Sequence, residues 1–341
     1  MGSLNWLTRR ISSQPIAVQF GSDAIRFMQI KGFSEHTLQG AVEVAVDDQG
    51  GITEALSSFK GKRCIASLPP KDVLIQHIRI AIDDDEDQIL ESLIKHDAKW
   101  GNAEIRTVCV KTTGAGNTAK QELLCIGVDR TISQNIVELL ESAGAEVVAV
   151  TVPLYASIRA FDKLYRRDGD EKMTSMIIDM DDQSSMVMIA HGANCVFAHR
   201  IESNSPKINE QWQSEQHASP PTLPISHSQQ NEFERRSEND PRGLSSIQGN
   251  NEEVEPNFAS ELERCLRHHD ALFSDRAVDR IIFTGQGAND SERCSAIASK
   301  LGIAGFIADP SAWIEGASEL AGGPMWTTVA GLCIRYSEKA A

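Results

Sequence analysis

Two stretches of the chain share one succession of apolar and polar positions. In residues 18–30, VQFGSDAIRFMQI, an apolar run ends at Gly21 and Ser22, and an alternating run follows. In residues 177–189, IIDMDDQSSMVMI, two apolar runs flank a polar turn in the same way. Apolar or alternating runs that meet at a short turn predict two paired strands. The repetition therefore predicts two similar halves, each of which begins with a hairpin.

Between the two hairpins, strand patterns alternate with helix patterns, which favours an α/β class. The predicted elements are strands on either side of Pro69 and Pro70, a helix over 83–100, strands over 104–112 and 121–129, a helix over 136–143, a strand over 147–152 and a helix from Pro153. The helix over 83–100 starts with five acidic residues, which suit the positive N-terminal end of a helix. Gly144 is placed to end the next helix.

Residues 203–256 break this pattern. They contain six of the twelve prolines and almost no apolar periodicity. A segment of this composition cannot bury enough apolar surface to offset the entropy of ordering, so we predict a disordered linker. After it, a helix is predicted over 257–273, followed by a buried strand that runs into the glycine turn TGQGA and by a helix over 291–302.

Composition restricts the classes of partner. The 341 residues carry a formal charge of -15, which repels phosphate backbones and anionic lipid, so we expect no nucleic acid partner. A length of 341 residues with 41% hydrophobic content predicts about two domains with a sizeable core. No apolar stretch reaches the roughly 18 to 20 residues that a membrane span needs.

The cysteines and histidines give no metal-site pattern. Seven cysteines occur singly, mostly in apolar runs, which is typical of reduced, buried thiols in the cytosol. Cys265 and His269 have the i, i+4 spacing of a metal-binding pair on one predicted helix. No further ligand types lie near them in sequence, so we expect a buried cysteine beside solvent-facing His268 and His269. We predict no metal ligands and no catalytic residues.

Together, the two hairpins and the later glycine turn resemble the actin-like ATPase superfamily. Within it, the stretches LLCIGVDRTISQNIVELLESAGAEVVAVTVPLYASIRAF, ELERCLRHHDALF with RIIFTGQGAN, and VAGLCIR are similar, in this order, to the PilM proteins of type IV pilus assembly, which are related to FtsA and to the cytoplasmic part of GspL. The resemblance implies a duplicated actin-like ATPase fold, with a small α+β subdomain inserted in the first half. It divides the chain into 1–60 and 130–172 (domain I), 61–129 (inserted subdomain), 173–202 and 257–341 (domain II) and 203–256 (linker).

The resemblance also implies a nucleotide cleft between the two halves. Its ATP-binding positions correspond to Gly21 and Ser22 in the first hairpin, Asp179, Ser184 and Ser185 in the second, and Gly285 and Gly287 in the glycine turn. Each motif departs from the family pattern, because Gln19 replaces an aspartate and Asp181 and Gln286 replace glycines. An amide attracts magnesium less than a carboxylate does, and a carboxylate repels phosphate. We therefore expect ATP binding to be weak or lost, with no dependable magnesium site, and the cleft glycines to serve as turn glycines of the fold.

The resemblance implies two functions. The one we favour is a cytoplasmic adaptor of a type IV pilus or type II secretion machine, without catalysis and held at the inner membrane through a partner. That partner would be a bitopic, PilN-like membrane protein, whose N-terminal cytoplasmic tail enters a groove between the segment Lys62–Ile82 and the sheet of the first half. The alternative is an active ATPase or small-molecule kinase of the same superfamily. FtsA-like membrane attachment and self-association are further possibilities, although the ending YSEKAA lacks an amphipathic pattern.

Overall fold

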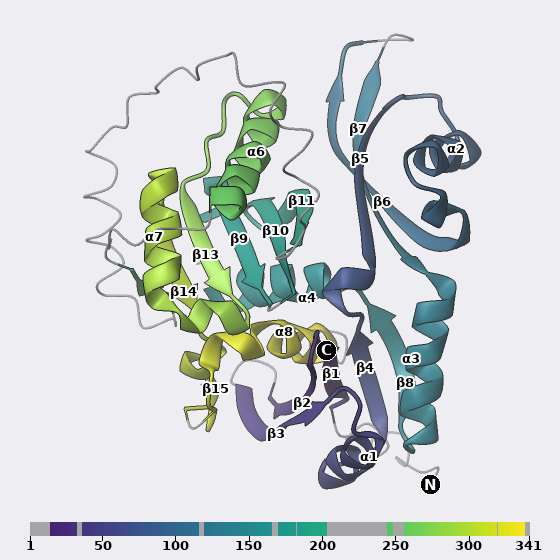
Figure 1. The fold of residues 1–341 in the computed structure, drawn as a ribbon, viewed down its shortest axis with the longest axis vertical. Helices are drawn as coiled ribbons and strands as arrows, with labels where there is room; N and C mark the ends of the chain where they lie inside the picture. Colours follow the sequence, from purple (N-terminus) through teal and green to yellow (C-terminus); the bar gives the residue numbers. More distant parts are fainter. Residues whose placement is uncertain are drawn as a thin grey trace, which may run out of the picture.

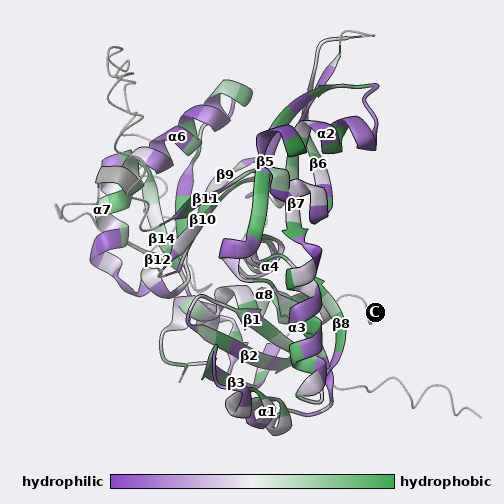
Figure 2. Cartoon of the chain, turned by 45° about the vertical axis from the view of Figure 1, so that its right-hand side comes forward, coloured by the Kyte–Doolittle hydropathy of each residue, from purple (hydrophilic) through white to green (hydrophobic). Residues whose placement is uncertain are grey.

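The computed structural model describes residues 14–32, 36–115, 119–165, 170–181, 183–202, 244–247, 256–318 and 320–337. These residues form two halves, each built on a six-stranded sheet, and a smaller unit with a three-stranded sheet (Figure 1). Hydrophilic residues lie along the outer helices α2, α6 and α7, where they alternate with hydrophobic ones (Figure 2). Among the described helices, none has the length and apolar character to cross a membrane.

The first sheet has the strand order β15-β3-β2-β1-β4-β8. Its strands are β1 (Ile16–Phe20), β2 (Ala24–Lys31), β3 (His36–Ala45), β4 (Arg63–Ser67), β8 (Glu146–Thr151) and β15 (Ile314–Glu315). The first three strands pair antiparallel, whereas β1, β4 and β8 run parallel. The predicted first hairpin is confirmed, with the pairs Val18↔Phe27 and Gln19↔Arg26.

The second sheet repeats this arrangement. Its order is β11-β10-β9-β13-β14-β12, with β9 (Thr174–Met180), β10 (Ser184–His191), β11 (Asn194–Glu202), β12 (Leu244–Ser246), β13 (Arg280–Thr284) and β14 (Ala304–Ala308). Again the first three strands form an antiparallel meander, and β9, β13 and β14 run parallel. All seven residues of β9 are buried, as expected for the centre of a sheet that is covered on both faces. The predicted duplication is therefore confirmed.

Helices follow the strands in the same order in both halves. They are α1 (Gln49–Ser58), α3 (Arg130–Ser142) and α4 (Pro153–Ala160) in the first half, and α6 (Pro256–Leu272), α7 (Ser291–Leu301) and α8 (Thr327–Ser337) in the second. The last helix of each half lies between the two sheets, where α4 and α8 pack on each other (Figure 1). Although α8 follows the second sheet in sequence, it packs on β1, β2 and β4 of the first. The two halves therefore share a core.

The inserted subdomain lies between β4 and α3. It has an antiparallel sheet of order β5-β7-β6, with β5 (Val73–Ala81), β6 (Ala103–Thr113) and β7 (Lys120–Asp129), and the helix α2 (Glu86–His96). The predicted acidic start of this helix is a capping box, in which Asp85 accepts from the main chain of Gln88 and the Gln88 side chain accepts from Asp85 N–H. The acidic run is therefore helix-end chemistry.

Three predicted boundaries were wrong. We placed β4 in the inserted subdomain, but it pairs with β1 in the first sheet, so the subdomain begins near Val73. We placed all of 257–341 in domain II, but β15 pairs with β3 of the first sheet. We predicted disorder throughout 203–256, but β12 pairs antiparallel with β14. The rest of that segment, 203–243 and 248–255, lies outside the described residues.

Candidate functional site

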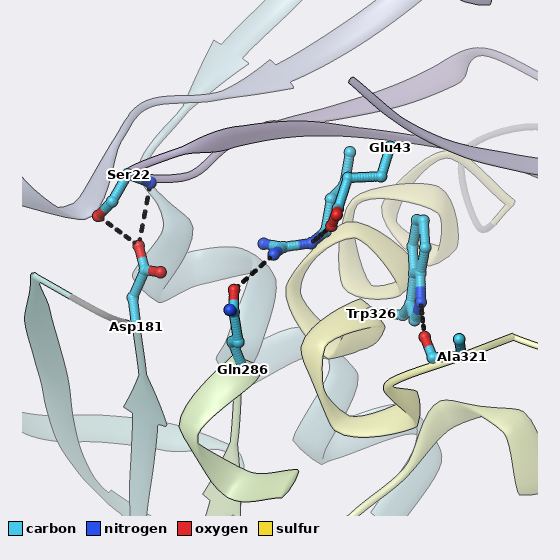
Figure 3. Close-up of polar contacts among 7 residues, drawn as sticks. Ser22, Glu43, Asp181, Gln286, Ala321 and Trp326 are labelled. Carbon is cyan, nitrogen blue, oxygen red and sulfur yellow. Dashed lines mark hydrogen bonds and ion pairs between the residues drawn. The ribbon is translucent and has the colours of Figure 1, made fainter. Parts of the chain in front are cut away.

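The turn between β1 and β2 contacts the turn between β9 and β10 directly. Ser22 donates its main-chain N–H to Oδ2 of Asp181 at 3.1 Å, and its hydroxyl donates to the same oxygen at 2.7 Å (Figure 3). A β-carbon on Gly21 would lie 3.9 Å from this carboxylate oxygen. The structure thus brings Gly21 and Ser22 together with Asp181, the residue for which we predicted phosphate repulsion.

A buried arginine, which the sequence analysis did not consider, lies beside these turns. Arg26 of β2 is 5% exposed, and its Nε forms an ion pair with Oε2 of Glu43 at 2.7 Å. Its Nη2 donates to Oε1 of Gln286 in the glycine turn at 3.1 Å (Figure 3). The signal for it was an arginine between Ile25 and Phe27 in a mostly apolar strand, since a buried charge needs a partner. Arg26 thereby links the first hairpin to the glycine turn.

Asp179 is held by hydroxyl groups rather than by a cleft ligand. Its Oδ2 accepts hydrogen bonds from Ser157 of α4 at 3.0 Å and from Thr328 of α8 at 2.7 Å. The two hydroxyl oxygens lie 2.8 Å apart. Burial raises the pKa of Asp179, and these two hydrogen bonds oppose the rise. Asp179 therefore joins β9 to the helix pair α4 and α8.

The predicted serines of the second hairpin belong to a group of buried, neutral side chains at the strand ends. Ser184 and Ser185 are 2% and 3% exposed. Within the described part of the chain, four buried side-chain oxygens at these strand ends have no hydrogen-bond partner: Gln19 Oε1, Ser67 Oγ, Ser184 Oγ and Thr284 Oγ1. Gln19 is paired in register with Ser67 in the first half, and Thr284 is paired with Asp179 in the second. Each half therefore contributes two of the four groups.

The glycines of the third turn permit close packing on β9. Gly285 has φ +83°, and its N–H donates to the Pro324 carbonyl at 3.1 Å. A β-carbon on Gly285 would lie 2.5 Å from Oδ1 of Asp179, and one on Gly287 would lie 2.9 Å from Cβ of Met180. Both positions therefore require glycine because the turn lies directly against the end of β9. This packing accounts for both glycines without a ligand.

These residues do not fit a magnesium–nucleotide complex. The donors of Ser22 already bind a carboxylate, and Asp179 is engaged by two hydroxyls. The buried side chains at the ends of β1 and β10, Gln19 and Ser184, are neutral, whereas magnesium sites in proteins use carboxylates. The described residues contain no group of three or more His, Cys, Asp or Glu side chains that could hold a metal ion.

A pocket of about 640 Å³ lies between the inserted subdomain and the first half. One wall consists of residues of β6 and β7, such as Ile105 and Val128, and the other of residues of β8 and α4, such as Val150 and Tyr155. Of the segment Lys62–Ile82, which we predicted as a wall, only Leu68 lines it. The reason is that β5 is the far strand of the subdomain sheet, whereas β6 is the near edge.

Two properties of this pocket suit a peptide. In the sheets of the described residues, β6 and β8 each pair on one side only, so each has a free edge. The lining also carries charges of both signs: Glu104, Arg106, Arg159, Asp162 and Lys163. Apolar side chains, charged groups and edge strands together can bind an extended segment through its main chain and its side chains.

Histidines join the inserted subdomain to the second half. His77 of β5 stacks on Phe197 of β11 with 4.9 Å between ring centroids, and the ring centroid of His268 of α6 lies 5.1 Å from that of His77.

A second histidine pair lies within the second half, where the Nε2 atoms of His191 and His269 are 2.9 Å apart. Cys265 is buried as predicted, but our prediction of a solvent-facing His269 was wrong, since this ring is fully buried. The partner ring, His191, comes from a distant strand.

Comparison with solved structures identifies the fold. A chain of the PilM–PilN type IV pilus biogenesis complex superposes with a TM-score of 0.65 over 95% of this chain and 98% of that chain, at 13% identity. The cytoplasmic domain of EpsL, an inner-membrane component of the Vibrio cholerae type II secretion system, gives 0.42 over 63% and 87% at 12% identity. A Bacteroides thetaiotaomicron protein with an actin-like ATPase fold and unknown function gives 0.46 over 96% and 99% at 11% identity.

Sequence comparisons add nothing to this likeness, because no family model and no curated protein matches the chain. The repeated sheet plan, the helix pair between the sheets and the inserted subdomain agree with the fold that we expected from the sequence. The chain therefore has the duplicated actin-like ATPase fold expected from its sequence, and it shares its fold with a chain of the PilM–PilN complex.

Proposed function

We propose that this protein is a cytoplasmic scaffold of a type IV pilus or type II secretion machine. On this proposal it is held at the inner membrane by the cytoplasmic tail of a bitopic, PilN-like assembly protein. The observation that carries the proposal is the 640 Å³ pocket between two edge strands, in a chain whose fold is shared with the PilM–PilN complex. The tail lies in this pocket in an extended conformation.

The lining of the pocket defines the tail that it accepts. Ile105, Val128 and Val150 offer apolar surface, so leucine-type side chains of the tail supply most of the affinity. The net charge of the chain, -15, favours a basic tail. In the pocket itself, Lys163 pairs with Asp162 at 3.3 Å, and β6 contributes Glu104 and Arg106, one charge of each sign. Charged residues of the tail are therefore expected to set its register rather than its affinity.

The test is a titration of a labelled tail peptide of the candidate partner, read by fluorescence anisotropy. Val150→Asp places a charge in the apolar wall, and we expect it to weaken binding at least about tenfold. Val46→Asp is the matched control, because Val46 is 43% exposed and lies outside the pocket. Replacing leucines of the peptide should weaken binding at any salt concentration, whereas charge reversals should matter mainly at low salt.

The proposal fails if the folded protein shows no saturable binding at micromolar peptide. It also fails if Val150→Asp, with a thermal transition like that of wild type, binds the peptide as tightly as Val46→Asp does, because the peptide then binds elsewhere.

The proposal assigns no turnover to the cleft between the halves. It is supported by the engagement of Ser22 with Asp181 and of Asp179 with Ser157 and Thr328. A kinase or ATPase needs ligands for magnesium and a positioned base, and no observation in this cleft favours one. ATP is therefore proposed to bind weakly or not at all.

A further inference from the structure

A second pocket, of about 570 Å³, lies between the inserted subdomain and the second half. Its subdomain wall, within the described residues, consists of Val108, Cys109 and Val110 of β6. The opposite wall comes from the end of β10, the start of β11 and the segment after α6, and it includes Val196 and Phe273. Three valines and a phenylalanine therefore supply apolar surface beside the polar side chains of the lining.

This second pocket reaches the free edge of β6. Successive side chains of a strand point to opposite faces, so a pocket lined by three β6 residues in a row, and by none of the described residues of β7, lies at the edge of the sheet. A β-bulge adds to this, because the register of β6 against β7 shifts between Cys109 and Lys111 and leaves Val110 without a paired residue. Main-chain groups on the unpaired side of β6 are therefore within reach of an occupant.

Lys111 and His191 hold the end of α6 against the other walls of the second pocket. Lys111 of β6 donates to the carbonyl of Leu272, the last residue of α6, and its Nζ lies 5.3 Å from the ring centroid of Phe273. The His191 ring meets the same phenylalanine nearly at a right angle, with 4.6 Å between centroids. The walls are therefore in place before a ligand binds, which keeps the entropic cost of binding low.

The two pockets are neighbours along the same two elements. Residues 104–106 of β6 line the first pocket, of 640 Å³, and residues 108–110 line the second, so only Thr107 separates them. In the β10–β11 hairpin, Ala193 lines the first pocket and Asn194 lines the second. A segment that lies along the edge of β6 from residue 104 to residue 110 therefore passes through both pockets.

We propose that the second pocket binds a second apolar side chain of the same extended tail, four residues away from the one in the first pocket. The midpoints of the two lined stretches, residues 105 and 109, are about 13 Å apart along a strand. Two side chains at this spacing in an extended tail lie on one face, so both can enter the groove. We call these two side chains the anchors of the tail. The inference rests on the proposed function and deepens it, and the continuity of the groove assigns both pockets to one occupant.

The test uses the thiol of Cys109 as a reporter of the second pocket. Cys109 is exposed, whereas the other six cysteines are buried or half-buried, so iodoacetamide should modify it first, and mass spectrometry identifies the adduct. The sample is the full-length protein with the tail peptide of the candidate partner. At about ten times the Kd of the peptide, about one tenth of the protein remains free, so we expect alkylation of Cys109 to slow about tenfold. Fluorescence anisotropy on the same samples measures binding itself.

Shortened and lengthened peptides test the spacing of the anchors. The half-peptide that carries only the first anchor is recognised by its loss of binding to Val150→Asp. We expect it to bind at least about tenfold more weakly than the whole peptide, because one apolar side chain is no longer buried. It should leave Cys109 as reactive as in the free protein. One residue inserted between the anchors turns the second to the opposite face and should cost as much affinity.

The outcomes separate this inference from the proposed function. Saturable binding with Cys109 unprotected overturns the inference alone, because the tail then occupies the first pocket only. Protection of Cys109 by the half-peptide also overturns it, because the protection is then indirect. Tight binding of a tail without two apolar residues at this spacing overturns it as well. Absence of saturable binding at micromolar peptide overturns both the inference and the proposed function.

Discussion

Gly331 of α8 faces the Ala156 carbonyl of α4 with no room for a side chain between them. A β-carbon at residue 331 would lie 2.0 Å from that carbonyl oxygen and 3.2 Å from Cβ of Ala160. These two helices are the last elements of the two halves, and they also carry the Ser157 and Thr328 hydroxyls that bind Asp179. The crossing at Gly331 therefore fixes the core that the halves share, and Gly331 also lines the 640 Å³ pocket.

We expect Gly331→Ala to destabilise the protein by about 1–3 kcal/mol, the range for overpacking a tight contact. In a helix without such a contact, the same change stabilises by about 0.5–1 kcal/mol. Gly50→Ala in α1 is the matched control, because its β-carbon would meet only Oδ1 of Asp48, at 3.5 Å. Urea unfolding of both variants measures the difference. Equal stability of Gly331→Ala and wild type would show that α4 and α8 can separate at no cost.

The second prediction concerns pH. Burial, and after it the neighbouring His268, lower the pKa of His77 to about 4, and His199 contributes in the same direction. Because this value lies below the ordinary 6.5, the unfolded chain binds more protons between these two pH values. Stability should therefore fall as the pH decreases from about 6.5 towards 4. The slope for one such group is at most about 1.4 kcal/mol per pH unit, and less for a ring that water partly reaches.

Urea unfolding across this pH window measures the effect. His77→Gln removes the titrating ring from the contact with Phe197 and should reduce the slope. His96→Gln is the control, because His96 is an exposed histidine in the last turn of α2. If His77→Gln and His96→Gln change the slope equally, the contact between the inserted subdomain and the second half is not the source of the pH dependence.

Local chemistry made several elements predictable. The hairpins were found because alternation and turn residues lie next to each other in the sequence. Gly144, with φ +91°, ends a helix as glycine commonly does. By contrast, the sheet that receives β4 depends on a partner strand elsewhere in the chain, and the five residues of this strand, RCIAS, carry no sign of it.

The site was predicted less well than the fold, for a related reason. The motifs located Ser22 and Asp181, but not the hydrogen bonds between them, because 159 residues separate the two. Asp179 was placed in the cleft by its motif, whereas its partners, Ser157 and Thr328, lie on two helices that only the folded chain brings together. Ser157 and Thr328 had no sequence signal that distinguished them from other buried hydroxyls.

The third prediction concerns β12, which lies within the segment that we expected to be disordered. The N–H of Ile247 donates to the Gly305 carbonyl at 3.2 Å, and its side chain packs on the core of the second half. We expect Ile247→Asp to destabilise the protein by about 1–2 kcal/mol, since a half-buried apolar side chain is lost and a charge takes its place. Ile82→Asp, at a 43% exposed isoleucine, should cost less. Equal thermal transitions for Ile247→Asp and wild type would mean that β12 contributes nothing to the fold.

The last prediction concerns the cleft, where one substitution should free hydrogen-bond donors for a phosphate and a second should add a ligand for magnesium. Wild type is expected to bind ATP with magnesium weakly, because Asp181 holds the donors of Ser22 and Gln19 is a neutral amide. Asp181→Gly frees these donors and removes a negative charge, and Gln19→Asp adds a carboxylate where the Gln19 Oε1 has no hydrogen-bond partner. We expect the double variant to bind ATP at least about tenfold more tightly than wild type, the effect of one charge-assisted hydrogen bond or more.

Calorimetry with ATP, in the presence and absence of magnesium, measures both steps of this prediction. Asp181→Gly alone should gain affinity that does not depend on magnesium, because it supplies no metal ligand. The gain from Gln19→Asp should appear only with magnesium, since without the metal a second carboxylate repels the phosphates. Asp23→Gly is the control for a lost charge in the same turn and should leave the affinity near that of wild type. Tight, magnesium-dependent binding of ATP by the wild-type chain would contradict the argument, because it would require Asp181 and Gln19 to tolerate the phosphates and the metal that their chemistry disfavours.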